Sequence, residues 1–266
     1  KLDQVQILVL DEADHMLDLG FAKDISDLVD KIPGRRQTLF FSATINPTIK
    51  KQAYQMVGSG AIRIQVSPKD PVSKNVDHQM VFVEMDDKRF FLQRLLQENS
   101  DKKFLVFVRT KVRAERVKKA MERADIDTLT IHGDKEQDDR ETALLAFRAG
   151  ACRIMIATDV TARGIDIDGI DFVVNYDLPD VAENYVHRVG RTGRGRAKGK
   201  AVSFCAKEEK EYLSAIEEYT TVPIKRAMVT KGEYSETVDL ADDGKDDWKS
   251  LMKQEPVKKK KKGKKK

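Results

Sequence analysis

The 266-residue chain has only two cysteines and no long apolar segment. Cys152 and Cys205 lie far apart, without a CxxC pair or a neighbouring histidine. This spacing argues against a disulfide framework and a cysteine-based zinc site, and it is typical of a reducing compartment. No apolar run approaches the roughly 18 residues of a membrane helix, and no signal peptide is apparent. We therefore expect a cytoplasmic protein without a membrane partner.

The net positive charge of the chain comes from its C-terminus. The formal net charge is +5, but the last nine residues, KKKKKGKKK, contain eight lysines, and without them the net charge is −3. Any nucleic-acid site in the body of the protein must therefore depend on individually placed arginines. The lysine-rich end has two compatible interpretations: a salt-sensitive contact with phosphate, or a solvated, disordered segment that aids solubility.

Two blocks of alternating strands and helices predict an α/β protein. In the first block, apolar strands are expected at 5–10, 37–44 and 61–66, with helices at 22–32 and 46–57. Short, almost wholly apolar strands that alternate with helices are typical of a parallel sheet covered on both faces. The first block therefore predicts an open parallel sheet with flanking helices.

The second block predicts a larger sheet of the same kind. Helical patterns cover 111–124, 136–150 and 207–219. In such doubly wound sheets, ligands bind beyond the carboxyl ends of the strands. The six expected strands are 80–84, 104–108, 127–131, 153–157, 172–175 and 201–205.

Changes in composition predict the domain boundaries. Residues 67–78, SPKDPVSKNVDH, contain two prolines and no periodicity, which indicates a linker between domains. This leaves one α/β region at 1–66 and a second at 79–228. Residues 229–266 lose the alternating pattern, and we expect them to form a disordered basic tail.

Carboxylates follow the first predicted strand directly. The strand ILVL, residues 7–10, continues into Asp11-Glu12-Ala13-Asp14. An aspartate at the end of a buried strand can hold Mg²⁺, usually through water, and a neighbouring glutamate can orient the attacking water in phosphoryl transfer. The alternative is an acidic helix N-terminus, which the helix dipole favours.

Three further segments carry polar residues that could belong to a site. Ser42-Ala43-Thr44 follows TLFF and, taken alone, is typical of a helix N-cap. Residues 157–167 read ATDVTARGIDI, a strand end and a polar turn. Residues 187–194, HRVGRTGR, hold three arginines together with glycines that would let the backbone approach a ligand. Taken alone, this last segment would be a basic loop.

Five segments together resemble the DEAD-box ATP-dependent RNA helicases. They are LDEADHMLDLGF, FSAT, HGDKEQDDR, ATDVTARGIDI and HRVGRTGR, in the family's order and at similar separations. The resemblance extends from residue 1 to about residue 228. It implies RecA-like domains, with the latter half of the first domain in 1–66 and a complete second domain in 79–228.

The resemblance implies ATP and Mg²⁺ as cofactors. Asp11 and Glu12 would be the catalytic carboxylates, with Asp11 holding Mg²⁺ through water. Asp14 would couple this site to Ser42 and Thr44.

On the opposite side of the ATP site, the resemblance implies that Arg191 and Arg194 reach the phosphates. Arginines in this role contribute on the order of 10³–10⁵ in rate. His187 would lie at the same interface, and Asp166 would touch the ribose.

RNA is the partner that the resemblance implies, bound through phosphate and 2′-OH contacts with little reading of sequence. Arg109 and Thr110 match the family's fourth motif less closely, because an arginine stands where the family often has asparagine. The other residues expected to contact RNA are Gln137, Arg140, Thr158, Asp159, Arg163 and Gly164.

A GxxxxGK[ST] loop, which cradles phosphates in this family, does not occur in the printed sequence. Because residue 1 is also not methionine, we expect a C-terminal fragment that alone neither hydrolyses ATP nor unwinds RNA. The parent protein would couple ATP hydrolysis to local RNA unwinding or remodelling of RNA–protein complexes. Two alternatives are a non-catalytic RNA-binding or scaffolding protein that retains the second domain, and a related helicase acting on DNA.

Overall fold

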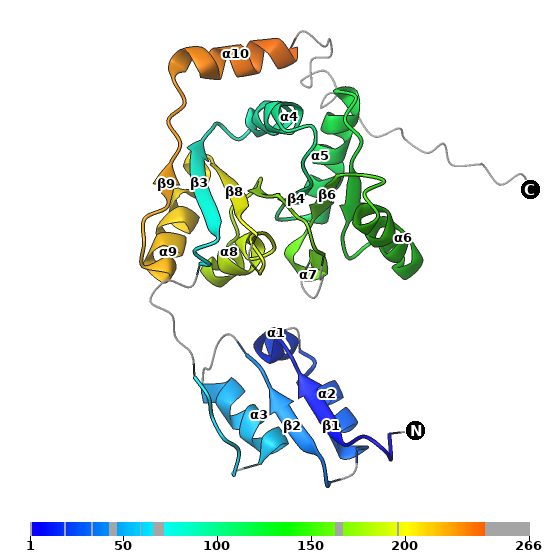
Figure 1. Ribbon diagram of the computed structural model, residues 1–266. Helices are drawn as coiled ribbons and strands as arrows, with labels where there is room; N and C mark the ends of the chain where they lie inside the picture. The colour runs from blue at the N-terminus through cyan, green and yellow to red at the C-terminus, as the bar shows by residue number, and fades with distance from the viewer. Residues whose placement is uncertain are drawn as a thin grey trace, which may run out of the picture. The chain divides into compact units, whose positions relative to one another are not determined.

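The computed structural model describes residues 2–18, 20–32, 34–42, 47–58, 60–65, 72–162, 167–195 and 197–242. The chain divides into two compact units, Lys1–Ser67 and Pro68–Lys266, and each is considered by itself (Figure 1). No helix in the described ranges has the length and apolar character needed to cross a membrane.

The first unit contains a two-stranded parallel sheet, in which Ile7 is opposite Gln37 and Leu10 is opposite Phe40. Its elements are β1 (Ile7–Leu10), α1 (Ala13–Asp18), α2 (Ala22–Asp30), β2 (Gln37–Phe40) and α3 (Pro47–Val57). Strand β1 alternates strictly: Leu8 and Leu10 are buried, whereas Ile7 is 57% exposed and Val9 52% exposed. Only one face of this strand therefore reaches the core.

The predicted strand at 61–66 is wrong over the described residues 61–65, which have no regular structure. Ile62 is 91% exposed and Ile64 is 84% exposed. The alternating isoleucines fit a strand locally, but strand preference depends on packing against neighbours. Within the described residues of this unit, only β1 and β2 pair.

The second unit contains a seven-stranded parallel sheet in the order β5-β6-β4-β7-β8-β3-β9 (Figure 1). The strands are β3 (Val76–Phe82), β4 (Phe104–Phe107), β5 (Leu129–Ile131), β6 (Ile154–Ala157), β7 (Phe172–Asn175), β8 (Gly199–Cys205) and β9 (Lys225–Arg226). The six strands expected from the sequence are thus present, with β3 beginning earlier than predicted, and β9 is an additional two-residue edge strand.

Helices cover both faces of this sheet. They are α4 (Lys88–Glu98), α5 (Lys111–Arg123), α6 (Gln137–Arg148), α7 (Asp159–Ala162), α8 (Ala182–Val189), α9 (Lys210–Thr220) and α10 (Lys231–Asp242), with a 3₁₀ turn, η1 (Lys207–Glu209). The central strand β4 serves both cores: Phe104 and Val106 pack with α4 and α5, whereas Leu105 and Phe107 pack with α6, α8 and α9. This two-sided burial confirms the doubly wound α/β fold.

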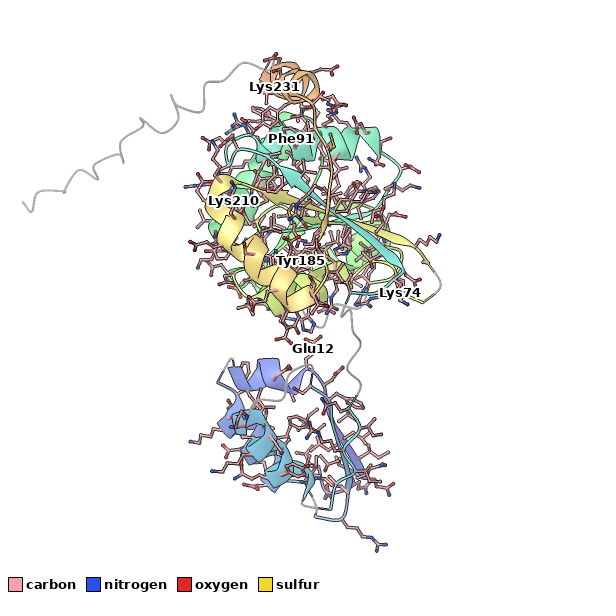
Figure 2. All side chains as sticks on the ribbon, turned by 90° about the vertical axis from the view of Figure 1, so that its left-hand side faces the viewer. Glu12, Lys74, Phe91, Tyr185, Lys210 and Lys231 are labelled. Atoms are coloured by element: carbon pink, nitrogen blue, oxygen red, sulfur yellow. The ribbon has the colours of Figure 1, made fainter. Side chains whose placement is uncertain are left out.

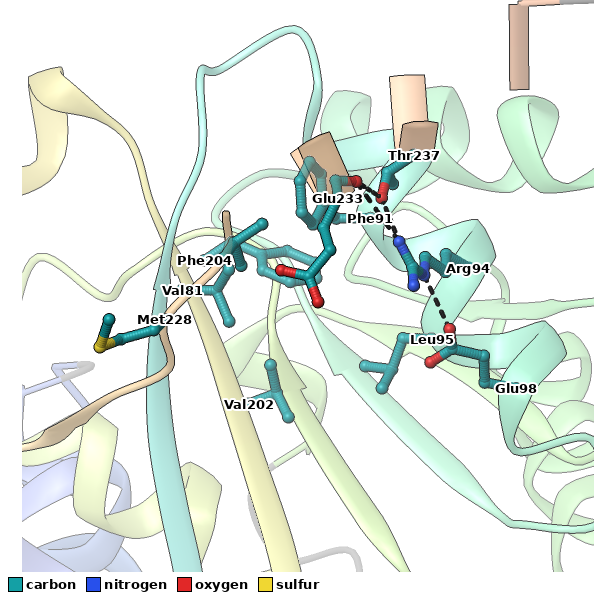
Figure 3. Close-up of a pocket in the computed structure, with 11 residues that line it drawn as sticks. Val81, Phe91, Arg94, Leu95, Glu98, Val202, Phe204, Met228, Glu233 and Thr237 are labelled. Atoms are coloured by element: carbon teal, nitrogen blue, oxygen red, sulfur yellow. Dashed lines mark hydrogen bonds and ion pairs between the residues drawn. The ribbon is translucent and has the colours of Figure 1, made fainter. Parts of the chain in front are cut away.

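The prediction of disorder after residue 229 is wrong for 231–242, which form α10. Tyr234 of α10 lies with its ring centroid 5.0 Å from that of Phe91, and its hydroxyl donates to Asp87 Oδ2 at 2.6 Å. Arg94 of α4 donates to Thr237 Oγ1 at 2.6 Å (Figure 3). A few long-range contacts, which local composition does not reveal, thus hold this helix in place. Residues 243–266 lie outside the described part of the chain.

Candidate functional site

The carboxylates after β1 lie at the same sheet edge as the segment after β2. Because the two strands are parallel neighbours, their carboxyl ends meet at one edge. The backbone N–H of Ala13 donates to the carbonyl of Phe41 at 3.0 Å, which ties the Asp11–Asp14 turn to the residue before Ser42. Thr44, which the sequence analysis also assigns here, lies outside the described residues.

Glu12 has an unusual backbone conformation, with φ at +48°. Such a value is uncommon for a residue other than glycine and costs on the order of 1–3 kcal/mol. The carboxylate of Asp11 accepts from the Glu12 N–H at 2.9 Å and helps to hold the turn. Figure 2 shows Glu12 where this turn leaves the sheet. Asp11 is exposed and Asp14 is buried, so the two aspartates have different surroundings.

The donor set around Asp11 is compatible with Mg²⁺. Among the described residues, no group of three or more His, Cys, Asp or Glu side chains forms a metal cage. Mg²⁺ is usually held by one or two carboxylates together with water and substrate phosphates. An exposed carboxylate at a strand end meets that requirement.

In the second unit, predicted site residues gather at the carboxyl edge of the sheet. Thr158 follows β6 directly, Arg109 lies two residues after β4, and Gln137 begins the helix after β5. All strands are parallel, so these positions share one edge. Arg140 Nη1 donates to Gln137 Oε1 at 3.1 Å, which orders this predicted RNA-contacting pair.

Arg188 is a central residue that the sequence analysis missed. Its side chain is 1% exposed, and its Nε and Nη2 atoms bind the two carboxylate oxygens of Asp159 at 2.6 and 2.7 Å. Its Nη1 donates to Asn175 Oδ1 at 3.2 Å and to the Asp177 carbonyl at 2.7 Å. This bidentate ion pair joins ATDVTARGIDI to HRVGRTGR.

A signal for Arg188 was available in the sequence. Tyr185 and Val189, three residues before it and one after it, are apolar and belong to the buried face of α8. An arginine on that face must find partners in the interior. The helical spacing therefore distinguishes Arg188 from its neighbours in the motif.

Within HRVGRTGR, the side chains of His187, Arg191 and Arg194 are partly exposed. His187 Nε2 lies 3.3 Å from Glu183 Oε1. Arg191 Nε donates to the His187 carbonyl at 3.3 Å, and Arg194 Nε donates to the Gly190 carbonyl at 3.4 Å. His187 lies in the last turn of α8 and Arg191 and Arg194 follow the helix, and their roles toward ATP stay predictions.

Gly193, the glycine of RTGR, packs closely against another segment of the chain. Gly193 has φ at +68°, and a Cβ there would lie 2.8 Å from Val76 Cγ2 and 3.0 Å from the Asn75 carbonyl oxygen. The small size of this glycine therefore admits the start of β3, and the expectation that a glycine here lets the backbone approach a ligand stays a prediction. Arg163, Gly164 and Asp166 lie outside the described residues.

Thr158 and Thr161 fix the start of the turn after β6. Their hydroxyl oxygens are 3.1 Å apart, and Thr161 Oγ1 donates to the Ile131 carbonyl at 2.9 Å. Asp159 lies between them, at the first position of α7. The turn is therefore anchored both to β5 and, through Asp159, to Arg188.

Arg109 is fixed more firmly than its weaker motif match suggested. Its Nη2 donates to Glu209 Oε1 at 2.9 Å, and its guanidinium carbon lies 4.8 Å from the ring centroid of Tyr212. Thr110 caps α5, since its hydroxyl accepts from the Arg113 N–H at 3.1 Å. Glu209 is a second residue that the sequence analysis missed.

A cavity of about 200 Å³ lies between α4, α10 and the sheet (Figure 3). None of its lining residues is a predicted site residue. Those that form its apolar floor include Val81, Phe91, Leu95, Val202 and Phe204.

Comparison with known proteins agrees with the motifs. The sequence model described as DEAD/DEAH box helicase matches residues 1–52, and the model described as helicase conserved C-terminal domain matches residues 87–196. The ATP-dependent RNA helicase CshA of Listeria monocytogenes is 40% identical over 220 residues, covering 83% of this chain and 42% of that protein. RhlB of Pseudomonas syringae pv. tomato, also an ATP-dependent RNA helicase, is 38% identical, covering 82% of this chain and 55% of the relative. The chain thus spans about half the length of these curated relatives.

Solved structures show the same RecA-like fold. Dbp5 of S. cerevisiae, bound to RNA and ADP BeF3, is similar with a TM-score of 0.76 and 30% identity, covering 92% of this chain and 64% of that chain. The E. coli DEAD-box protein SrmB, bound to regulator of ribonuclease activity A, has a TM-score of 0.55 and 30% identity, covering 59% of this chain and 92% of that chain. From its two family matches, its relatives and its fold, the chain belongs to the DEAD-box helicase family.

Proposed function

We propose that this chain is part of an ATP-dependent RNA helicase that couples ATP hydrolysis to local RNA unwinding or to remodelling of RNA–protein complexes. The observation that carries the proposal is the ion pair between Arg188 and Asp159. It links the segment proposed to contact RNA with the segment proposed to contact ATP. The names of the relatives support this function.

The proposed ATP chemistry is divided between two sets of side chains. Asp11 would hold Mg²⁺ through water, and Glu12 would orient the attacking water. Arg191 and Arg194 donate to phosphate oxygens, where negative charge is highest in phosphoryl transfer. When bound, Mg²⁺ neutralises charge on the phosphates. The remaining proposed contacts are Asp14, Ser42 and Thr44 for coupling, His187 for interface geometry and Asp166 for the ribose.

The proposed RNA contacts address phosphate and ribose, so little sequence specificity is expected. Gln137 and Arg140 form an ordered pair. Asp159 can accept a 2′-OH only through lone pairs that Arg188 leaves, so its main proposed role is to hold the turn. The other proposed contacts are Arg109, Thr158, Arg163 and Gly164.

We also propose a cytoplasmic location and the domain division given by the sequence. Cys152 and Cys205 are both free thiols, which supports a reducing compartment. The division of the structure after Ser67 supports domains near 1–66 and 79–228. The second domain then gains α10 from the segment assigned to the tail.

RNA binding by the 266-residue chain is the direct test. In a fluorescence anisotropy titration, single-stranded RNA should bind more tightly than DNA of the same sequence, because 2′-OH contacts are proposed. Equal affinity for the two would favour a helicase acting on DNA or a non-specific charged surface.

The proposed ATP hydrolysis has to be tested in a longer protein that contains both this sequence and a phosphate-binding loop. There, Arg191→Ala should lower ATP turnover by about 10³–10⁵-fold and change RNA affinity far less. Arg226→Ala is the matched control, since Arg226 lies on the edge strand β9 and is paired with Glu217. Equal, small losses in turnover and affinity would contradict the role of Arg191. RNA binding without ATP turnover by the parent would favour the scaffolding alternative.

A further inference from the structure

Five charged side chains cluster where β4, β7 and β8 end. Lys88, Asp177 and Glu209 are almost completely buried, at 0%, 3% and 1% exposure. Arg109 and Arg113 reach the surface, with side chains 34% and 27% exposed. Buried charges are costly unless each is paired and hydrogen-bonded. The cluster therefore requires an arrangement that satisfies every member.

Glu209 is the hub of this cluster. Its Oε1 accepts from Arg109 Nη2 at 2.9 Å and from the Leu178 N–H at 3.2 Å. Its Oε2 accepts from Lys88 Nζ at 2.5 Å and from the Ala206 N–H at 3.0 Å. With two donors on each oxygen, the carboxylate is held in a single orientation.

Asp177 and Tyr212 hold the rest of Arg109. Asp177 Oδ2 accepts from the Arg109 backbone N–H at 3.1 Å, while Oδ1 accepts from Arg113 at 3.1 Å. The Tyr212 ring lies 4.8 Å from the Arg109 guanidinium carbon. The backbone, the guanidinium edge and the guanidinium face of Arg109 are thus each fixed by a different residue.

This arrangement leaves Arg109 able to bind an anion. Within the described residues, Glu209 is the only hydrogen-bond partner of its guanidinium, so most of its five N–H donors stay available. Burial lowers the pKa of Lys88, but the adjacent carboxylates of Glu209 and Asp177 oppose that effect. Three cationic side chains then face two carboxylates, and Arg109 is the most exposed of the three.

Arg109 is one of the RNA contacts already proposed, and we propose that Glu209 is its positioning residue, which holds the guanidinium ready for an RNA phosphate while Lys88 balances the buried charge of Glu209. The inference rests on the proposed RNA-binding function. A side chain already held in place loses less conformational freedom on binding. The guanidinium fork also matches phosphate geometry, which lysine does not.

The test is an anisotropy titration of the 266-residue chain with labelled single-stranded RNA over a series of salt concentrations. Arg109→Ala should weaken binding about tenfold and lower the salt slope by about one phosphate contact. Glu209→Gln should cause most of the same loss. In the Arg109→Ala background, Glu209→Gln should cause no further loss of affinity, although any loss of stability should persist.

A second route to the same residue avoids changing a buried charge. Tyr212→Leu keeps apolar packing but removes the ring beneath Arg109, and it should weaken binding two- to threefold only while Arg109 is present. Arg226→Ala is the control, since its side chain is 37% exposed and also paired with a glutamate. Comparison with the unsubstituted chain cancels the contribution of the lysine-rich end.

The outcomes separate the inference from the proposed function. Unchanged affinity and salt slope in Arg109→Ala would overturn the phosphate contact. A loss in Arg109→Ala with no loss in Glu209→Gln or Tyr212→Leu would overturn the positioning role, as would equal losses with and without Arg109. If the unsubstituted chain binds no RNA, the proposed function fails and this inference fails with it.

Discussion

Within the described residues, the carboxylates of the first unit follow a sheet of two strands, whereas the arginines of the second unit lie on a sheet of seven. Among the described residues of the first unit, one small cluster of buried apolar side chains consists of Leu8, Leu10, Ala13, Ile25 and Ile32, and Ile49 is also buried. In the second, two larger clusters cover the two faces of one sheet. The second unit therefore has a far greater share of the apolar burial that stabilises a fold.

The surfaces of the two units differ in the same sense. Ile7, Val9 and Phe41 of the first unit are each more than half exposed, and they lie on or next to its two strands. Every residue of β4 in the second unit is buried. Clustered exposed apolar side chains are typical of a surface that another segment or protein covers. The turn that holds Glu12 is therefore supported by a smaller buried core than the helix that holds Arg188.

Hydrogen exchange should show the largest difference between the units. Amides of β4, β6 and β7 should exchange slower than those of β1 and β2 by a factor on the order of 10³ or more, because they open only on global unfolding. Mass spectrometry of the exchanged chain measures both sets at once. Equal protection of residues 7–10 and 104–107 would show that the first unit is as stable as the second.

Arg188→Ala should be the most damaging arginine substitution in the second unit. It leaves Asp159 without its bidentate partner in a largely buried site, a loss of about 3–5 kcal/mol. Arg194→Ala, in the same motif but partly exposed, should cost less than about 0.5 kcal/mol. Urea unfolding followed by circular dichroism gives both values, and similar midpoints for the two variants would refute the structural role of Arg188.

Gly193→Ala and Gly195→Ala test how tightly RTGR packs. Both glycines have positive φ, +68° and +63°, so both variants pay roughly 1–2 kcal/mol of backbone strain. Only at Gly193 would the added Cβ also meet Val76 and Asn75. We expect Gly193→Ala to lower the Tm further, by several degrees. If the two variants have the same Tm, the close approach of Gly193 to β3 does not contribute to stability.

The sequence predicted elements whose signal is local. The run FLVFV predicted β4, and Val117 and Met121 of the predicted helix at 111–124 are buried as its spacing indicates. Elements held by distant contacts were missed or misplaced. Strand β9 exists through two residue pairs with β3, and α10 through contacts with α4. The pattern at 61–65 has the alternation of a strand, but within the described residues it pairs with no strand.

The candidate site divides in the same way. The motifs identified polar residues that are spaced along short continuous segments. The buried supports were missed: Arg188, Glu209 and Lys88 each form an ion pair with a residue 29 to 121 positions away. A charged residue is expected to be solvent-exposed unless its buried ion-pair partners are known. Of these three residues, only Arg188 has a helical spacing that indicates a buried position.

A substitution on the exposed face of β1 should have the smallest effect on the free energy of unfolding. Val9→Thr changes a half-exposed side chain and should alter the unfolding free energy by less than about 0.5 kcal/mol, while light scattering should show less self-association because an apolar side chain has left the surface. Leu10→Thr, one residue along and 6% exposed, should instead destabilise the unit, since it places a hydroxyl in the core. If Val9→Thr destabilises as much as Leu10→Thr, the outer face of β1 is covered in solution, and the contrast between the two units is smaller than their cores indicate.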